Sequence, residues 1–249
     1  MTKKLDEYDA ILSDLDGCLI SGSTPLPGCL EFIEKYENKL YIVSNNSTDT
    51  PLSLSAHLKS LGINFPSERI LLAGTTSVDY IAKHYPGKKL DLHGLESVKN
   101  YAQESGLKLS EDNPDVVLLT RNLNFTYTDL VRLSRHAFNK TPIIIANIDG
   151  SHPAPDGARI PETGALLAAL KSCVPDLVFT SIGKPEINLF EDALMLAKTS
   201  PSQALFIGDN PETDGKGAKT AGLDFKLIQH GNPMMDLNAL MNHQHRHTH

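Results

Sequence analysis

Four short polar clusters stand out because each follows a run of apolar residues. They are "DLDG" (14–17), "SNN" (44–46), "GKP" (183–185) and "GDNPETD" (208–214). Each cluster alone is typical of an ordinary turn. Four such clusters, each at the end of an expected strand, instead indicate one shared site, because ligands of open parallel sheets bind outside the carboxyl ends of the strands.

The residue types in these clusters suit phosphate chemistry. The acidic members are Asp14, Asp16, Asp209 and Asp214. Such an oxygen-rich set fits Mg²⁺, and a cation would also relieve the repulsion between the first two carboxylates. Ser44 supplies a hydroxyl group, and Lys184 supplies a positive charge suited to phosphate. A carboxylate can attack phosphorus to form an acyl phosphate, and a second carboxyl group can protonate the leaving oxygen.

The elements that must position these clusters alternate between strand and helix. Expected strands lie in "YDAILSDLDG", "KLYIVSNNS", "RILLAG", "DLVFTSIGKP", "QALFIGDN" and "DFKLIQHG", and helical patterns lie between most of them. This alternation favours a parallel sheet covered by helices on both faces. A helix is expected from about residue 76 to residue 84, and His57, His84, His93 and His136 are interpreted as structural or surface residues.

The spacing of the clusters predicts a second α/β unit. Asp14 and Ser44 are 44 − 14 = 30 residues apart, whereas Ser44 and Lys184 are 184 − 44 = 140 residues apart. A strand–helix–strand unit needs about 30 residues or a little more, so the second interval contains a large excess. Residues 1–84 and 179–249 are therefore assigned to a discontinuous core, and residues 85–178 to the inserted unit.

Composition narrows the class of protein. The chain has 249 residues and a net charge of −7, which disfavours general binding to nucleic acid or anionic membranes. Its three cysteines show no C-x-x-C spacing, and it has neither a signal-peptide pattern nor a run of membrane-span length. These features predict a cytoplasmic protein. The terminal "NHQHRHTH" is interpreted as a disordered tail, with metal binding as the alternative.

The ordered set of motifs resembles the haloacid dehalogenase superfamily of phosphotransferases. The segments "SNNSTDTPLSLSAHLKSLGI", "ANIDGSHPAPDGARIPETGALLAAL" and "GKPEINLFEDAL" are similar to the NagD-like or p-nitrophenylphosphatase subfamily, which includes pyridoxal phosphate and phosphoglycolate phosphatases. The resemblance covers nearly the whole chain except the tail. It implies an α/β fold: a Rossmann-like three-layer parallel-sheet core with an inserted, smaller α/β cap domain that closes over the active site.

The resemblance also implies roles for the acidic residues. Asp14 would be the nucleophile that forms an aspartyl phosphate, and Asp16 would be the general acid and base, with its backbone carbonyl on Mg²⁺. Asp209 would be the third metal ligand from the protein. Asp214 would hold a metal-bound water or its neighbours.

The same resemblance implies how phosphate and substrate are bound. Ser44 and Lys184 would bind the transferring phosphoryl group, helped by the backbone N–H of Asn45, and Asn46 of the same motif is a further substrate-binding candidate. In the cap the candidates are Arg121, Asn147, Asp149 and His152. The alternative for "NIDGSH" is an Asx-type turn with a surface histidine. Thr120 and Ile148 stand where relatives often have Asp and Pro, which leaves the substrate preference open.

These expectations define the predicted function. The chain is expected to be a Mg²⁺-dependent phosphatase that hydrolyses small phosphate monoesters such as nucleotides, sugar phosphates, pyridoxal phosphate or phosphoglycolate. The alternatives are a non-catalytic phosphometabolite-binding protein and a phosphotransferase or mutase on the same fold. The expected partner is a small phosphate ester, without nucleic acid or membrane. Pairing of two caps into a homodimer, as relatives often show, is left open.

Overall fold

The computed structural model describes residues 3–242. The histidines of the C-terminal tail, which begin at residue 243, lie outside the described residues. The chain divides into two compact units. The core unit comprises Met1–Ser44, Pro51–Leu71 and Lys184–His249, and the cap unit comprises Asn45–Thr50 and Leu72–Gly183. Each unit is built on its own five-stranded sheet. In the described part of the chain, no helix is both long and apolar enough to cross a membrane.

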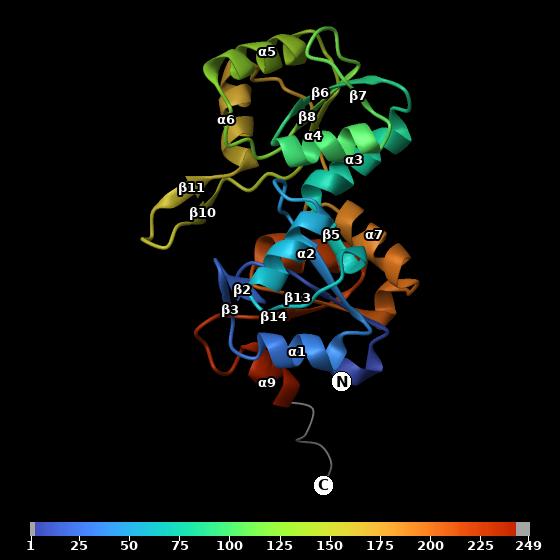
Figure 1. Cartoon of the computed structure of the whole chain (residues 1–249), viewed down its shortest axis with the longest axis vertical. Helices are drawn as coiled ribbons and strands as arrows, with labels where there is room; N and C mark the ends of the chain where they lie inside the picture. The colour runs from blue at the N-terminus through green and yellow to red at the C-terminus, as the bar shows by residue number, and fades with distance from the viewer. Residues whose placement is uncertain (1–2, 243–249) are drawn as a thin grey trace. The chain divides into compact units, whose positions relative to one another are not determined.

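The core sheet has the strand order β14-β13-β1-β4-β5, and Figure 1 labels its members β5, β13 and β14. Its strands are β1 (Ala10–Ser13), β4 (Leu40–Ser44), β5 (Ile70–Leu72), β13 (Ala204–Gly208) and β14 (Asp224–Leu227). The pairs β1–β4, β1–β13 and β13–β14 are parallel. Starting at β1, the chain adds β4 and β5 on one side, and later adds β13 and β14 on the other. The strand order therefore reverses between β1 and β13, which is where an open parallel sheet binds ligands.

The central strands of the core are mostly apolar because both faces of the sheet are covered. Every residue of β1 and β13 is buried. The helices are α1 (Cys29–Tyr36), α2 (Pro51–Ser60), α7 (Asn188–Ala197), α8 (Lys216–Ala221) and α9 (Leu237–Asn242). Shorter pieces are η1 (Leu5–Glu7), η2 (Ser67–Arg69), η3 (Pro201–Gln203), the π-helical turn η4 (Pro211–Gly215) and a hairpin of β2 (Ile20–Ser21) and β3 (Thr24–Pro25). Helix α7 packs against β1 and β4.

The cap unit is a second, smaller α/β sandwich. Its sheet has the order β12-β9-β8-β6-β7, and all of these pairs are parallel. The strands are β6 (Lys89–His93), β7 (Lys108–Leu109), β8 (Val116–Leu119), β9 (Ile143–Ile145) and β12 (Thr180–Ser181). The helices are α3 (Ala73–His84), α4 (Glu96–Glu104), α5 (Tyr127–Phe138) and α6 (Thr163–Cys173). A hairpin of β10 (Ser151–Pro153) and β11 (Arg159–Pro161) stands out from this sandwich (Figure 1).

Strand alternation divides the cap core into two apolar layers. Val116 and Leu118 of β8 pack with α3 and α4, whereas Val117 and Leu119 pack with α5 and α6. Successive strand side chains point to opposite faces, so one continuous apolar strand serves both layers. With the core sheet, this arrangement confirms the predicted fold class of a Rossmann-like core with an inserted α/β cap.

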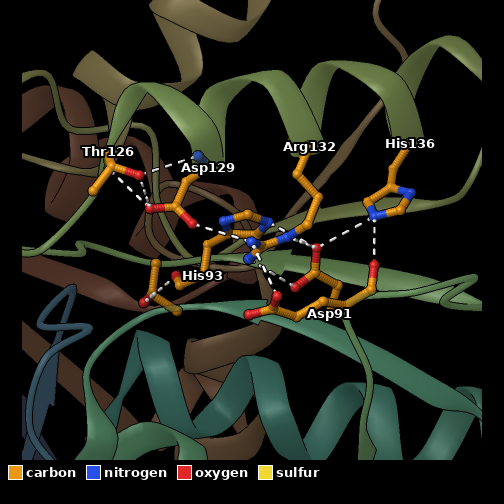
Figure 2. Close-up of polar contacts among 8 residues, drawn as sticks. Asp91, His93, Thr126, Asp129, Arg132 and His136 are labelled. Atoms are coloured by element: carbon orange, nitrogen blue, oxygen red, sulfur yellow. Dashed lines mark hydrogen bonds and ion pairs between the residues drawn. The ribbon is translucent and has the colours of Figure 1, made fainter.

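Strand β6 places polar side chains inside the cap. Leu90 and Leu92 pack in the layer of α3 and α4, so Asp91 and His93 face α5. Figure 2 shows the Asp91 carboxylate, which is 2 % exposed, accepting from Nε of Arg132 at 3.0 Å and lying 2.9 Å from Nε2 of His93. Nε2 of His136 lies 3.5 Å from the same carboxylate. Burial alone would raise the pKa of Asp91, but His93 and Arg132 outweigh it and hold that pKa below its usual range.

The structure differs from the sequence-based elements at several places. Strand β6 was not expected, because its pattern Leu-Asp-Leu-His places polar residues at buried positions. The β2–β3 hairpin was not expected as a hairpin either. Helix α3 begins at Ala73 instead of near residue 76, and it packs in the cap unit, whereas residues up to 84 were assigned to the core. The predicted domain ranges stay a prediction.

Candidate active site

A buried lysine organises the carboxyl edge of the core sheet. The Lys184 side chain is 2 % exposed, and its ammonium donates to Oδ1 of Asp14 at 3.0 Å and Oδ1 of Asp214 at 2.8 Å. It also donates to the backbone carbonyl of Val43, at the end of β4, at 2.9 Å. An ammonium group has three donors, so these three contacts hold Lys184 in one position. The site therefore contains a fixed positive charge between two carboxylates.

Three carboxylates meet beside this lysine. Asp14, Asp209 and Asp214 each offer an oxygen atom, and these atoms lie within 4.8 Å of one another. Asp14 follows β1, Asp209 follows β13, and Asp214 lies in η4, so the group forms at the reversal of strand order. All the ligand atoms that this group offers are carboxylate oxygens. Such a donor set fits a hard cation such as Mg²⁺.

Glycines allow the carboxylates to approach the backbone. Gly17 has φ +77°, a conformation that L side chains rarely adopt, and a Cβ there would collide with the Asp209 carboxylate. A Cβ at Gly208 would collide with the Asp214 carboxylate. The glycines of "DLDG" and "GDN" are thus required by the packing of the acidic group. They explain why each aspartate motif includes a glycine.

Burial and mutual repulsion disfavour the ionised forms of these carboxyl groups, even beside the Lys184 ammonium. Burial raises the pKa of Asp14 to about 6, and the charges of Asp209 and Asp16 add to this effect against the opposing charge of Lys184. Burial and the charge of Asp14 raise the pKa of Asp214 to about 6 as well. Burial alone would lower the pKa of Lys184, but Asp14 and Asp214 outweigh it and raise that pKa. One ammonium is therefore too little positive charge for this acidic group.

Asp16 and Ser44 are the remaining predicted residues of the core, and they follow β1 and end β4, respectively. Asp16 is exposed and forms an isolated bridge with Ile20, whereas Asp14 is largely buried. Two aspartates that are only two residues apart in the sequence thus have different environments. Ser44 is the last residue of β4 and is 3 % exposed.

The predicted residues of the cap unit form a network of their own. Nδ2 of Asn45 donates to Oδ2 of Asp149 at 3.0 Å, and Nδ2 of Asn147 donates to the backbone carbonyl of Asn45 at 2.8 Å. The backbone N–H of Asp149 donates to Oδ1 of Asn147 at 3.1 Å, which is an Asx-type turn. Oδ1 of Asn46 accepts from the backbone N–H groups of Thr48 and Asp49, so this side chain shapes the turn after β4.

The other two predicted cap residues meet at a carboxylate that the sequence analysis missed. Oε1 of Glu162 lies 2.6 Å from Nδ1 of His152 and 3.7 Å from NH1 of Arg121. The backbone N–H of Arg121 donates to Oγ of Ser47 at 2.9 Å. A signal was available, since Glu162 lies in the segment "ANIDGSHPAPDGARIPETGALLAAL", which is similar to the subfamily.

The fold and the acidic group define a Rossmann-like α/β core that carries an inserted α/β cap. The haloacid dehalogenase-like hydrolase family matches residues 11–108, and the HAD-hydrolase-like family matches residues 181–248. The chain is 27 % identical to a dihydroxyacetone phosphatase of Corynebacterium glutamicum, over 88 % of this chain and 80 % of that protein. It is 28 % identical to a 5'-nucleotidase of Bacillus subtilis, over 90 % of this chain and 88 % of that protein.

A solved structure gives the same result. The glycerol phosphate phosphatase of Mycobacterium tuberculosis in complex with magnesium has a TM-score of 0.87 and 25 % identity, covering 97 % of this chain and 79 % of that chain. The present chain therefore belongs to the haloacid dehalogenase superfamily, in the NagD and p-nitrophenylphosphatase subfamily. It is a phosphoric monoester hydrolase that acts on small phosphate monoesters.

Proposed function

We propose that the chain hydrolyses small phosphate monoesters through an aspartyl phosphate on Asp14, with Mg²⁺ as its cofactor. The observation that carries this proposal is the buried contact of Lys184 with Asp14 and Asp214, beside Asp209, at the reversal of strand order. A buried nucleophile, a fixed cation and an acidic group that fits a metal ion are the parts that phosphoryl transfer needs. The intact set also disfavours a purely binding protein.

The reaction proceeds in two steps. An oxygen of the Asp14 carboxylate attacks phosphorus, the bond from phosphorus to the ester oxygen breaks, and Asp16 donates a proton to the leaving alcohol. Asp16 then accepts a proton from water as that water attacks phosphorus, which releases inorganic phosphate and restores the Asp14 carboxylate. Lys184 and Ser44 bind the transferring group and stabilise its charge. The ion would be held by Asp14, Asp209 and Asp214 and would supply further positive charge.

The different environments of the two aspartates support these roles. Asp14 is held against Lys184, which orients one of its oxygens and favours the ionised form that a nucleophile needs. Asp16 is exposed, so the water molecule from which it accepts a proton in the second step can reach it. We further propose that Arg121, Asn147, Asp149 and His152 bind the organic part of the substrate, with Asn45 and Asn46 shaping the segment beside them.

The substrate is tested by phosphate release from a panel of small esters. The panel contains p-nitrophenyl phosphate, three-carbon and sugar phosphates, nucleoside monophosphates, pyridoxal phosphate and phosphoglycolate. We expect turnover in the presence of Mg²⁺, no turnover after removal of metal with EDTA, and full recovery when Mg²⁺ is added back. Binding of panel members without turnover would contradict the proposal. Transfer of phosphate to an added sugar or alcohol acceptor, without release of inorganic phosphate, would favour a phosphotransferase instead.

Mg²⁺ is also expected to stabilise the fold, and more strongly at about pH 7.5 than at about pH 5. The pKa values of Asp14 and Asp214 are raised to about 6, compared with about 3.9 for an unfolded aspartate. Because the folded pKa is the higher one, their protonation stabilises the metal-free fold at low pH, and this contribution is lost as the pH rises through about 6. At higher pH the ionised carboxylates bind the ion without competition from protons.

Thermal unfolding with and without Mg²⁺ at the two pH values measures this effect. The increase in melting temperature should be larger at the higher pH, and Asp209→Asn should reduce it by removing a charged ligand. Glu31→Gln, which changes an exposed carboxylate on α1, should leave it unchanged. Equal increases at both pH values, or a full increase in Asp209→Asn, would show that the ion does not bind at this group.

A further inference from the structure

Glu162 lies between two cap residues that come from different elements. Arg121 follows β8, His152 lies in β10, and Glu162 is the residue before the first turn of α6. Oε1 of Glu162 contacts both of them, at 3.7 Å from NH1 of Arg121 and 2.6 Å from Nδ1 of His152. One oxygen atom therefore connects a strand end, a hairpin and a helix start. The Glu162 side chain is 18 % exposed, so solvent screens these contacts less than it would at the open surface.

The backbones around this carboxylate are fixed by other contacts. The N–H of Arg121 donates to Oγ of Ser47, and Oγ of Ser47 lies 3.3 Å from Oγ1 of Thr163. The N–H of Glu162 donates to the carbonyl of Gly150 at 3.0 Å, which anchors the hairpin to the start of α6. These contacts already hold the main chain. The contacts of the Glu162 carboxylate therefore act on the orientation of the Arg121 and His152 side chains.

Both side chains keep hydrogen-bonding capacity for a ligand. Among the residues that the structure describes, Nε of Arg121 is buried and has no hydrogen-bond partner. A guanidinium group has five N–H donors, so contact with one carboxylate oxygen leaves most of them unused. With Nδ1 of His152 held by Glu162, the ring orientation is fixed and Nε2 is the nitrogen left for another partner.

We propose that Glu162 is a positioning residue for substrate recognition. It orients the Arg121 guanidinium and the His152 imidazole so that their remaining polar groups bind the organic part of the phosphate ester. This inference rests on the proposed function, in which these two residues bind substrate. Glu162 does not take part in phosphoryl transfer, so its loss acts on substrate affinity and leaves the chemical step intact.

The test is steady-state kinetics of Glu162→Gln, which keeps the shape of the side chain and removes its charge. Two substrates are used: p-nitrophenyl phosphate and the panel ester with the lowest KM. For the panel ester, KM should rise about tenfold, the equivalent of one charge-assisted hydrogen bond, while kcat stays within about twofold. Asp156→Asn, in the loop of the same hairpin, is the control, because its carboxylate accepts from the backbone N–H of Ala158 and an asparagine can do the same.

A double-mutant cycle separates orientation from a general loss of structure. Arg121→Ala should raise the same KM, and adding Glu162→Gln to it should raise KM little further, because the residue being oriented is gone. If Glu162→Gln does not fold, the cycle of Arg121→Ala and His152→Ala replaces it. These two residues share Oε1 of Glu162, so their effects on KM should be less than additive.

The outcomes distinguish this inference from the proposed function. If Arg121→Ala and His152→Ala raise KM but Glu162→Gln does not, the positioning role is wrong while the substrate-binding roles stand. If none of the variants changes KM for any panel ester, the proposed substrate-binding roles are wrong as well. A fall in kcat without a change in KM for Glu162→Gln would also overturn the positioning role, because it would place Glu162 in the chemical step.

Discussion

Asp14→Asn is expected to lower the rate of phosphate release by about 10⁴-fold or more. An amide is a far weaker nucleophile than a carboxylate, so the aspartyl phosphate cannot form. Substrate binding should survive, because Lys184 keeps its contacts with Asp214 and the Val43 carbonyl. The measurement is kcat for p-nitrophenyl phosphate with Mg²⁺, with circular dichroism to confirm the fold. Full activity in this variant would falsify the assignment of Asp14.

Asp16→Asn provides the matched variant for Asp14→Asn, since it makes the same chemical change two residues away. p-Nitrophenolate leaves without needing a proton, so the first step should continue when Asp16 cannot donate one. The second step needs Asp16 to accept a proton from water and should become slow. Phosphorylated enzyme should therefore accumulate in Asp16→Asn and be absent in Asp14→Asn, as measured by mass spectrometry after acid quenching. A phosphoryl group on any residue other than Asp14 would contradict the mechanism.

Lys184→Met is expected to lower the free energy of unfolding by about 3–5 kcal/mol at neutral pH in the absence of metal. It removes the cation between Asp14 and Asp214, which leaves buried carboxylates without their partner. The loss should shrink below about pH 6, because both carboxyl groups have raised pKa values and become neutral there. Urea unfolding across this pH range measures the effect.

An exposed lysine provides the control for Lys184→Met. Lys219, in α8, is exposed, so Lys219→Met should change stability by less than about 0.5 kcal/mol. Adding Mg²⁺ should recover part of the stability of Lys184→Met, because the ion supplies positive charge to the same carboxylates. Turnover should still be lost, since the transferring phosphoryl group lacks its fixed cation. A pH-independent loss of stability would mean that packing, instead of charge, explains the role of Lys184.

Much of the core fold could be predicted from the sequence because local residues mark the ends of its strands. The motif "DLDG" follows an apolar run, and its glycine reports the close approach of another group, although the sequence does not say that this group is Asp209. The contact of Lys184 with Asp14 joins residues 170 positions apart, so only the topology of the sheet reveals it. The family resemblance implied roles for these residues, and the structure shows which of their side chains meet.

The cap was harder to predict because the hydrogen-bond partners of its buried polar residues lie far away in the sequence. Strand β6 carries Asp91, whose partner Arg132 lies 41 residues further along the chain. From its neighbours in the sequence alone, an aspartate is predicted to lie in a turn, because those neighbours carry no information about a distant partner such as Arg132. Glu162 was missed for the same reason. Its contacts with Arg121 and His152 arise from the folding of three separate segments, and none of them is marked by a motif.

Polar contacts with Asp91 also contribute to how α5 is rotated about its own axis. Asp129, Arg132 and His136 turn toward the sheet, so the opposite side of the helix carries Tyr127 and Phe138, which are 82 % and 76 % exposed. Hydrophobicity alone would favour turning these aromatic rings inward. Leu133 and Ala137 of α5 are buried in the apolar layer, so apolar packing and the contacts with Asp91 together fix which side of the helix faces the sheet. If Asp91, Arg132 and His136 were replaced by apolar residues, α5 would stay helical but would lose the polar contacts that help to define which side faces the sheet.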